Sequence, residues 1–530
     1  MIKIFATTDI HGKLYPYDYR TMSESNSSIC HVKTLIDSLS DENSIIVDNG
    51  DLIQGNFVEN FVDKYNPAIM SINEIGYDIW NMGNHEFNFG EKNLLKNVAA
   101  FKNSALIANI DHPIMNSYKI IEVNGIKIAF IGIDTLMVNS FGNDLLNHPP
   151  IVDPVETLNE LMPKIKPISD VIVGLFHVGM KDENSTLHTG VESILKDLKI
   201  PFDVIIAGHT HEEIEKKYIG ETLITQPGAY AKSVSLVELE FLNKSLINKN
   251  SKLIQSKNFY PDIDLLEKLL PFHRNIYDNI CRTIGYLENV EGDYDYDLED
   301  GPLIHLFTNA ISSYYPCDVM AFQFDFKNPV LKNGPLTLSE LSKIYSYTGG
   351  EVTVYKITGE QLRKYINWSY RYFSLINGHV EVSKRRARFK YKTLDIFGNI
   401  QYTIDLDKED VVYDLKYASG QPILDSDFLT IGMNQYRMNY LTCDRGPLKN
   451  TFAQKIISST ETKNNGKFGT IRELVEQYLK SLPNETFVYN GTKLFKVLQK
   501  KRQWKFNSPL SFYSYSFLYL QPFLLHYLFL

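Results

Sequence analysis

Five short polar segments in this sequence carry histidine, aspartate or asparagine, the residue types that bind metal ions and move protons. Each follows an apolar run, as Gly83-Asn84-His85-Glu86 follows Ile79–Met82. One such segment alone is more typical of a turn with a hydrogen-bonded histidine. The combination points to a shared site, because the other segments are Asp9-Ile10-His11, Gly50-Asp51, His177 and Gly208-His209-Thr210-His211.

These segments supply enough nitrogen and oxygen ligands for two divalent metal ions with one bridging carboxylate. Asp9 and His11 are two residues apart, as are His209 and His211, so at a strand end the members of each pair would point to the same side. The absence of cysteine from these segments favours Zn, Mn, Fe or Co bound through imidazole and carboxylate. The candidate ligands are Asp9, His11, Asp51, Asn84, His177, His209 and His211.

Two metal ions about 3.5–4 Å apart are suited to phosphoryl transfer. They would lower the pKa of a shared water and neutralise charge on the phosphate oxygens, so that a metal-bridging hydroxide attacks phosphorus. His85 adjoins a candidate ligand without itself having to bind metal. It is therefore the candidate to stabilise the developing charge or to protonate the leaving oxygen.

Alternating strand and helix patterns would position these residues. Up to about residue 240, apolar runs of four to eight residues alternate with helix-length segments, which is typical of an α/β domain with helices covering the sheet. Loops at the carboxyl ends of such strands converge. The expected strands are Ile2–Thr7, Ser44–Asp48, Ile79–Met82, Ala105–Ala108, Ile126–Ile133, Val171–Phe176, Val204–Ala207 and Thr222–Thr225, and the expected helices include Ile29–Leu39, Asn66–Ile75 and Pro154–Lys164.

At 530 residues the chain is too long for one ordinary core. We expect a catalytic domain over residues 1–248, a connecting helix segment over 249–292, bent at Pro271, an α+β domain over 293–507, and an apolar tail over 508–530. In the α+β domain the expected strands are Val319–Phe324, Val352–Ile357, Gln401–Leu406 and Phe428–Gly432, and the expected helices are Leu303–Ser313, Leu338–Ile344, Gly359–Phe373 and Ile471–Leu482.

Composition excludes several other classes. The net charge of −9 argues against a nucleic-acid polymer as partner. The four cysteines are far apart, which argues against a disulfide framework. We see no secretory signal, so a cytoplasmic location is expected, with export or membrane association as the alternative. The uncharged tail 508–530 is long enough to span a bilayer, but Pro509 and Pro522 make it a poor helix, so a membrane is not the expected partner.

The polar segments together resemble the five blocks of the calcineurin-like metallophosphoesterases. Their context, in Thr8–Gly12, Asp48–Gly55 and Gly83–Gly90, resembles the 2′,3′-cyclic-nucleotide 2′-phosphodiesterase branch of the 5′-nucleotidase family. The resemblance extends in layout over roughly residues 1–505. It implies an α/β fold with a four-layer αββα metallophosphatase domain, a connecting helix and an α+β C-terminal substrate-binding domain.

The resemblance also implies roles for individual residues. One metal would be held by Asp9, His11, Asp51 and His211, and the other by Asp51, Asn84, His177 and His209. His85 would be the catalytic histidine. Asn88 stands where 5′-nucleotidases have an aspartate that orients this histidine. An asparagine accepts the imidazole N–H but does not stabilise the imidazolium as Asp does, and the cyclic-phosphodiesterase branch commonly carries it.

In this family the C-terminal domain binds the nucleoside, with aromatic rings stacked on the base. The candidate substrate contacts are Asn434, Arg437, Tyr391, Phe397 and Tyr440, with Arg437 able to pair either with a phosphate or with a structural carboxylate. The expected substrates are 2′,3′-cyclic nucleotides and 3′-nucleotides. The alternatives are hydrolysis of 5′-nucleotides or nucleotide sugars, and a nucleotide-binding protein with little turnover.

Overall fold

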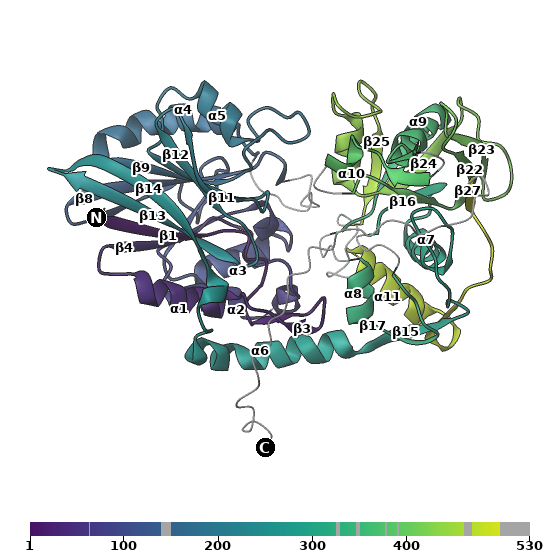
Figure 1. The fold of residues 1–530 in the computed structure, drawn as a ribbon, viewed down its shortest axis with the longest axis horizontal. Coiled ribbons are helices and arrows are strands. Elements are labelled where there is room, and N and C mark those ends of the chain that lie inside the picture. The colour runs from purple at the N-terminus through teal and green to yellow at the C-terminus, as the bar shows by residue number, and fades with distance from the viewer. Residues whose placement is uncertain are drawn as a thin grey trace, which may run out of the picture.

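The computed structural model describes residues 1–62, 64–138, 150–324, 329–345, 350–376, 379–388, 392–459 and 469–498. Two domains lie beside each other, and the long helix α6 (Ile263–Cys281) runs along one side from the first to the second (Figure 1). The predicted tail 508–530 and the stacking candidate Tyr391 lie outside the described residues.

Two six-stranded sheets form the centre of the first domain. One has the order β14-β13-β1-β4-β5-β6, and the other has the order β11-β12-β10-β9-β8-β7. The strands of the first sheet are β1 (Ile2–Thr7), β4 (Ser44–Asp48), β5 (Ile79–Asn81), β6 (Ser104–Leu106), β13 (Ser233–Leu242) and β14 (Ser245–Gln255). Those of the second are β7 (Tyr118–Val123), β8 (Ile126–Asp134), β9 (Val171–His177), β10 (Val204–Ala207), β11 (Glu213–Ile219) and β12 (Thr222–Pro227).

The sheets pack face to face and helices cover both outer faces, which gives the four-layer αββα architecture. In β1, Ile4 lies between the sheets and Phe5 points to the helices, as the two-residue period of a strand requires. The first sheet is covered by α1 (Ile29–Leu39), α2 (Pro67–Ile75) and α3 (Glu91–Ala100), and the second by α4 (Pro154–Ile165) and α5 (Val191–Asp197). Shorter elements are β2 (Tyr17–Asp18), β3 (Ser23–Glu24), η1 (Val58–Phe61), η2 (Asn84–Phe87), η4 (Lys166–Ile168) and η5 (Ser256–Asn258).

Two buried asparagines join the sheets where the parallel strands end. The Asn49 amide donates to the carbonyls of Phe176 and Ile206, at 3.0 and 3.1 Å. The Asn81 amide donates to Asn49 Oδ1 and to the Leu175 carbonyl, at 3.0 and 3.1 Å. Both side chains are fully buried. These bonds therefore fix the loops of one sheet against those of the other.

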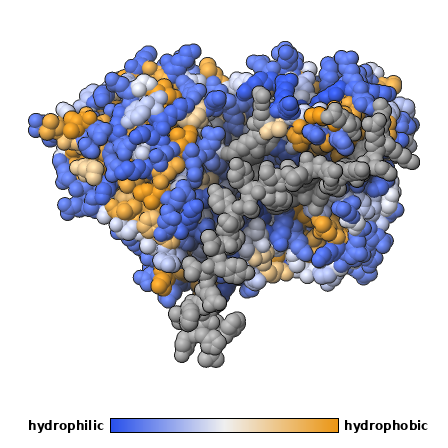
Figure 2. Space-filling model, in the orientation of Figure 1, coloured by the Kyte–Doolittle hydropathy of each residue, from blue (hydrophilic) through white to orange (hydrophobic). Residues whose placement is uncertain are grey.

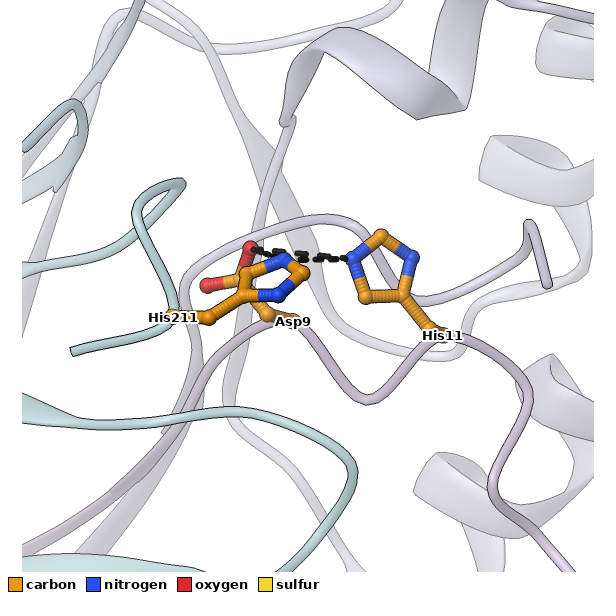
Figure 3. A group of neighbouring side chains, drawn as sticks. All are labelled: Asp9, His11 and His211. Atoms are coloured by element: carbon orange, nitrogen blue, oxygen red, sulfur yellow. Dashed lines mark hydrogen bonds and ion pairs between the residues drawn. The ribbon is translucent and has the colours of Figure 1, made fainter. Parts of the chain in front are cut away.

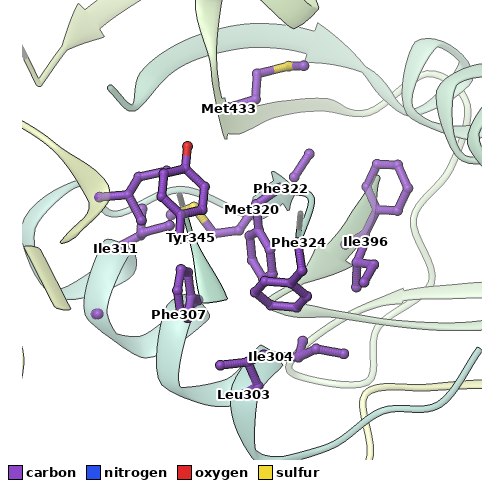
Figure 4. Close-up of a cluster of buried hydrophobic side chains, with 14 of the residues drawn as sticks. Leu303, Ile304, Phe307, Ile311, Met320, Phe322, Phe324, Tyr345, Ile396 and Met433 are labelled. Atoms are coloured by element: carbon purple, nitrogen blue, oxygen red, sulfur yellow. The ribbon is translucent and has the colours of Figure 1, made fainter. Parts of the chain in front are cut away.

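The second domain is α+β, as expected, with a five-stranded sheet of order β21-β16-β24-β18-β25 at its centre. Its large core gathers aromatic and aliphatic side chains around α7, and part of it is drawn in Figure 4. Its strands are β15 (Thr283–Glu288), β16 (Val319–Phe322), β17 (Gly334–Thr337), β18 (Thr353–Thr358), β19 (Phe373–Ile376), β20 (His379–Val382), β21 (Ile396–Gly398), β22 (Ile400–Asp405), β23 (Val412–Tyr417), β24 (Phe428–Met433), β25 (Gln454–Ser458), β26 (Thr486–Val488) and β27 (Phe495–Leu498). Its helices are α7 (Pro302–Tyr314), α8 (Leu338–Ile344), α9 (Gly359–Tyr370), α10 (Gln435–Thr442) and α11 (Ile471–Ser481), with η6 (Arg386–Arg388) and η7 (Pro483–Glu485).

Helix α6 belongs to both domains. Leu265 packs in the core of the first domain, and Ile280 packs in that of the second. The helix continues through Pro271. The predicted connector 249–292 differs from the structure at both ends, because β14 continues in the first sheet to Gln255 and β15 already pairs with strands of the second domain.

In the second domain the sequence patterns leave out several strands, among them the buried β21. In the first domain they locate most buried elements to within a few residues but leave out β7, β11, β13 and β14. Three of these, β7, β11 and β14, are largely exposed and rich in polar residues, so they lack the apolar run that marks a buried strand. Among the described residues, no helix is long and apolar enough to cross a membrane. On the face shown in Figure 2, apolar residues occur in separate areas among hydrophilic ones, as is common in globular proteins.

We predict that Asn81→Ala lowers the free energy of unfolding by about 2–4 kcal/mol, because the buried carbonyls of Leu175 and Ile133 lose their donor. Urea denaturation followed by circular dichroism measures this. Asn248→Ala, on an exposed position of β14, is the matched control and should stay within about 0.5 kcal/mol of wild type. Equal stability of the two variants would contradict a joining role for Asn81.

Candidate metal centre

All seven candidate ligands come together at the carboxyl ends of the parallel strands. Asp9 and His11 follow β1, Asp51 follows β4, and Asn84 begins η2 after β5. The second sheet contributes the rest: His177 is the last residue of β9, and His209 and His211 follow β10. Each sheet supplies part of the set, so the site exists only where the two sheets meet.

Asp9, His11 and His211 form one cluster whose ligand atoms lie within 4.8 Å of one another. Figure 3 shows the three side chains converging. Asp9 Oδ1 lies 3.8 Å from His11 Nε2 and 3.3 Å from His211 Nε2. The two Nε2 atoms are 3.0 Å apart. This cluster therefore turns one carboxylate oxygen and two imidazole nitrogens toward a common point.

Asp51, His177 and His209 form the second cluster, and their ligand atoms also lie within 4.8 Å of one another. His177 Nε2 lies 3.1 Å from Asp51 Oδ2. His209 Nδ1 lies 2.9 Å from Asn84 Oδ1, so the asparagine belongs to this group as well. Asp51 Oδ2 also lies 3.7 Å from His11 Nε2 of the first cluster. Asp51 thus stands between the clusters, in the position a bridging carboxylate needs.

Three of the imidazoles are oriented by an acceptor at their other ring nitrogen. His177 Nδ1 lies 2.7 Å from the Asn49 carbonyl, and His11 Nδ1 lies 3.0 Å from Gln54 Oε1. His209 Nε2 lies 3.0 Å from Glu183 Oε2. Such partners fix the tautomer and ring orientation of metal-binding histidines. They leave His177 and His11 with Nε2, and His209 with Nδ1, directed into the site.

The site suits divalent cations. Asp9 Oδ1 and His177 Nε2 are buried and have no hydrogen-bond partner among the described residues, which is costly unless a cation takes their lone pairs. The pKa of His177 is raised well above its ordinary value: burial opposes the charged form, but Asp51 and Asp9 outweigh it. The field at this point therefore favours positive charge. Neutral imidazoles and carboxylates match the ligands of Zn, Mn, Fe and Co.

Five of the candidate ligands adopt a left-handed backbone conformation that residues other than glycine rarely adopt. Asp9 and His11 come after the end of β1 at Thr7, and their side chains point into the same cluster through this left-handed backbone and not through strand alternation. The ligands with φ between +48° and +68° are Asp9, His11, Asp51, His209 and His211. Strained backbone of this kind concentrates at functional sites, where the surrounding structure holds it in place.

The glycines before the ligands are required by close approach. A Cβ on Gly50, whose φ is +96°, would lie 2.5 Å from Gly83 N and 2.9 Å from His177 Nδ1. A Cβ on Gly83 would lie 2.5 Å from Asp51 Oδ1. The two loops could not approach each other with larger residues there, which explains why Gly precedes Asp51 and Asn84.

His85 lies beside the clusters without belonging to either. Its backbone N–H donates to Asp51 Oδ1 at 2.9 Å, and its ring centroid is 5.5 Å from that of His11. Its Nδ1 lies 2.5 Å from Asn88 Oδ1, so the predicted His85–Asn88 pair is present as a contact. Burial lowers the pKa of His85, although Asp51 acts in the opposite direction.

Glu86 closes the Gly83–Glu86 motif, but no role for its side chain was predicted from the sequence. The carboxylate is fully buried and accepts backbone N–H groups from both loops. One oxygen takes those of Asp51 and Gly83, and the other takes those of Leu52 and Ile53. Burial, followed by the charge of Asp51, raises the pKa of Glu86 to about 7, although these N–H groups favour the charged form.

The predicted substrate contacts lie in or near α10 and β21, and most already have partners. Phe397 is fully buried and packs edge-on against Tyr365, so the prediction that it stacks on a base does not agree with its position. Arg437 Nε pairs with Asp395 Oδ2 at 3.0 Å, so of the two predicted partners, a phosphate or a structural carboxylate, the structure shows the carboxylate. The Asn434 amide donates to Glu351 Oε2 at 2.9 Å. Tyr440 is half-buried, beside Trp368.

Two residues near the clusters lacked any sequence signal. Tyr230 is 41% exposed, and its ring lies 5.3 Å from that of His211. Glu183 lies on the loop after β9 and contacts His209. Neither stands in a motif or after an apolar run of its own, so only the folded chain places them at the site.

Two family models match this chain, one in each domain. Residues 2–213 match the family described as calcineurin-like phosphoesterase, and residues 283–441 match the 5′-nucleotidase C-terminal domain. Calcineurin-like phosphoesterases use two divalent metal ions, and the two side-chain clusters agree with this.

Related proteins have nucleotide-hydrolase names. A 2′,3′-cyclic-nucleotide 2′-phosphodiesterase/3′-nucleotidase of Haemophilus influenzae is 26% identical over 487 residues, which cover 77% of this chain and 73% of that protein. A trifunctional nucleotide phosphoesterase of Bacillus subtilis is 24% identical over 84% of this chain, but the chain spans only 36% of its length. The structure of Haemophilus influenzae NAD nucleotidase shares the fold, with a TM-score of 0.59 and 14% identity over 94% of this chain and 99% of that one.

We predict that Glu86→Gln lowers the free energy of unfolding by about 2–4 kcal/mol and releases metal from the protein. The amide offers one acceptor oxygen, so two of the four buried N–H groups lose their partner. Urea unfolding and metal content after dialysis measure the two effects. Glu122→Gln, exposed on β7, is the control and should change neither. A Glu86→Gln protein with wild-type stability and metal content would contradict this role.

Proposed function

Because this chain joins a calcineurin-like phosphoesterase domain to a 5′-nucleotidase C-terminal domain and is a metal-dependent phosphoesterase, we propose that it hydrolyses small nucleotides. We propose 2′,3′-cyclic nucleotides and 3′-nucleotides as the preferred substrates, and 5′-nucleotides or nucleotide sugars as secondary ones. The name of the Haemophilus influenzae relative, a 2′,3′-cyclic-nucleotide 2′-phosphodiesterase/3′-nucleotidase, supports this order.

The observation that carries the proposal is the position of Asp51 between two ligand clusters, with His85 beside it. Asp51 Oδ2 faces His11 of one cluster and His177 of the other, and its Oδ1 accepts the His85 backbone N–H. In this proposal Asp9, His11, Asp51 and His211 hold one ion, and Asp51, Asn84, His177 and His209 hold the other. Two divalent ions bound there would supply an activated water and would neutralise phosphate charge.

The chain itself supplies the proton chemistry at the leaving group. With Nδ1–H donated to Asn88, a second proton on the His85 imidazole resides on Nε2. That atom is the donor to the oxygen that leaves phosphorus. Asn88 orients the ring but adds no negative charge, so His85 acts here with a neutral partner. The preorganised loops hold His85 next to Asp51 before substrate binds.

The base of the nucleotide would lie beside Tyr440. Tyr440 is four residues after Tyr436 on α10, so the two lie on the same side of the helix. Tyr436 donates to Glu183 at the metal centre, at 2.7 Å. A ring one helical turn from this contact is near enough to stack on a base whose phosphate lies at the clusters. Trp368 would extend this aromatic surface, because its ring centroid is 5.6 Å from that of Tyr440.

We predict that His85→Ala lowers kcat for 2′,3′-cyclic AMP by about 10²–10⁴-fold, the usual contribution of an acid–base group. The assay follows ring opening and phosphate release with added Mn²⁺, and it includes 3′-AMP and 5′-AMP to test the substrate order. Metal content should stay at the wild-type value, because His85 is not a proposed ligand.

His379→Ala is the control for this substitution, because His379 is exposed on β20, and it should keep wild-type rates. If wild type shows no metal-dependent hydrolysis of any of these nucleotides, the proposed function fails. If His85→Ala retains wild-type kcat with both metals bound, the role assigned to His85 fails while the activity stands.

A further prediction concerns the base. Tyr440→Ala should raise KM for 2′,3′-cyclic AMP by about 5- to 100-fold, because base stacking on an aromatic ring contributes about 1–3 kcal/mol. The rate with bis(p-nitrophenyl) phosphate, which has no nucleobase, should not change. Tyr286→Ala, at an exposed tyrosine of β15, is the control. An equal loss with both substrates would contradict a base-binding role for Tyr440.

A further inference from the structure

One carboxylate at the edge of the metal centre is shared by the two domains. Glu183 Oε2 lies 3.0 Å from Nε2 of the candidate ligand His209. Its other oxygen, Oε1, accepts the hydroxyl of Tyr436 at 2.7 Å. Tyr436 is on α10 of the second domain. A hydrogen-bonded path thus runs from the second domain to a residue of the metal centre in the first.

The ring nitrogens of His209 have separate tasks. Nδ1 lies 2.9 Å from Asn84 Oδ1, on the side of the second cluster, and Nε2 is directed at Glu183. A metal ion beside Asn84 would therefore take Nδ1, and Nε2–H would donate to Glu183. Carboxylates in this position orient a ligating imidazole and raise its basicity.

The first domain holds Glu183 from its own side. The Glu183 backbone N–H donates to Thr189 Oγ1 at 2.7 Å. On the same loop, His188 lies between Asp153 and Asp197, at 2.7 and 3.0 Å from their carboxylates. The side chain of Glu183 is only 22% exposed. Its position is therefore set by the loop and does not depend on a freely moving surface side chain.

The second domain likewise fixes the position of Tyr436 through hydrogen bonds at the start of α10. The first turn of α10 is anchored by the buried carboxylate of Glu351, which accepts the Gln435 backbone N–H at 2.7 Å and the Asn434 amide at 2.9 Å. Nearby, Arg445 Nε donates to Ser185 Oγ on the Glu183 loop, at 2.8 Å. The bond between Tyr436 and Glu183 therefore joins two residues whose backbone segments are each held by hydrogen bonds within their own domain.

We propose that Glu183 is a positioning residue of the metal centre and that its bond from Tyr436 couples the seating of the second domain to metal binding at His209. The proposal rests on the proposed function in one respect, the assignment of His209 as a ligand. When the second domain is seated, both carboxylate oxygens are used and the imidazole is held toward Asn84. When it is not, Glu183 loses one of its two donors.

The test measures metal binding directly. Chelator-treated full-length protein is titrated with Mn²⁺ by calorimetry, and with Co²⁺ by visible absorption. Glu183→Gln offers one acceptor oxygen where two donors need one each, and it should weaken one of the two binding steps by about 10- to 100-fold. Tyr436→Phe keeps the ring and removes only the hydroxyl. It should weaken the same step by about 2- to 10-fold, the effect of one hydrogen bond.

Arg445→Ala is the matched control, because it removes a neighbouring bond between the domains that does not reach a histidine. It should leave both binding steps unchanged. A Tyr436→Phe titration that overlays wild type would overturn the coupling, and so would an equal weakening of both steps. Because no nucleotide is used, a wild type that binds two ions but hydrolyses no nucleotide would refute the proposed function and leave this inference standing.

Discussion

The metal centre depends on one buried carboxylate. Glu86 accepts backbone N–H groups from the loop after β4 and from the loop after β5, and it thereby fixes both loops against each other. These loops carry Asp51, Asn84 and His85. The position of Asp51 between the two clusters and the placement of His85 beside it follow from this bond pattern, because the left-handed conformation of Asp51 has to be held by its surroundings.

A second constraint comes from the interface between the sheets. Asn49 and Asn81 donate across it, and Asn49 also places its own carbonyl on the imidazole of His177. Packing of aliphatic side chains brings two sheets together but does not set their relative position to a fraction of an ångström. Directional bonds at the strand ends do so, which is what a site assembled from both sheets requires.

The two domains are joined by apolar packing and by several polar contacts, among them Arg472 with Glu59, Arg445 with Ser185, and Tyr436 with Glu183. Helix α6 has its first half in one core and its second half in the other, and Phe57 and Phe61 of the first domain pack into the core of the second. The contact between Tyr436 and Glu183 lies at the metal centre itself. Apolar packing holds the domains together but is not directional. The hydrogen bond from Tyr436 to Glu183 is directional and defines the local geometry with few atoms.

The sequence by itself determined the α/β fold class, most buried strands and the seven residues that converge, because apolar period and the position of polar residues at strand ends are local properties of the chain. It did not reveal β7, β11 and β14, which are largely exposed and lack that pattern, nor the buried strands β13 and β21. Only the tertiary structure decided that Phe397 is buried, that Arg437 is paired with Asp395, and that Glu183 and Tyr230 border the site. Burial and pairing depend on which distant segments meet. The left-handed conformations of the ligands have the same origin, since they are imposed by contacts between loops and not by the residues themselves.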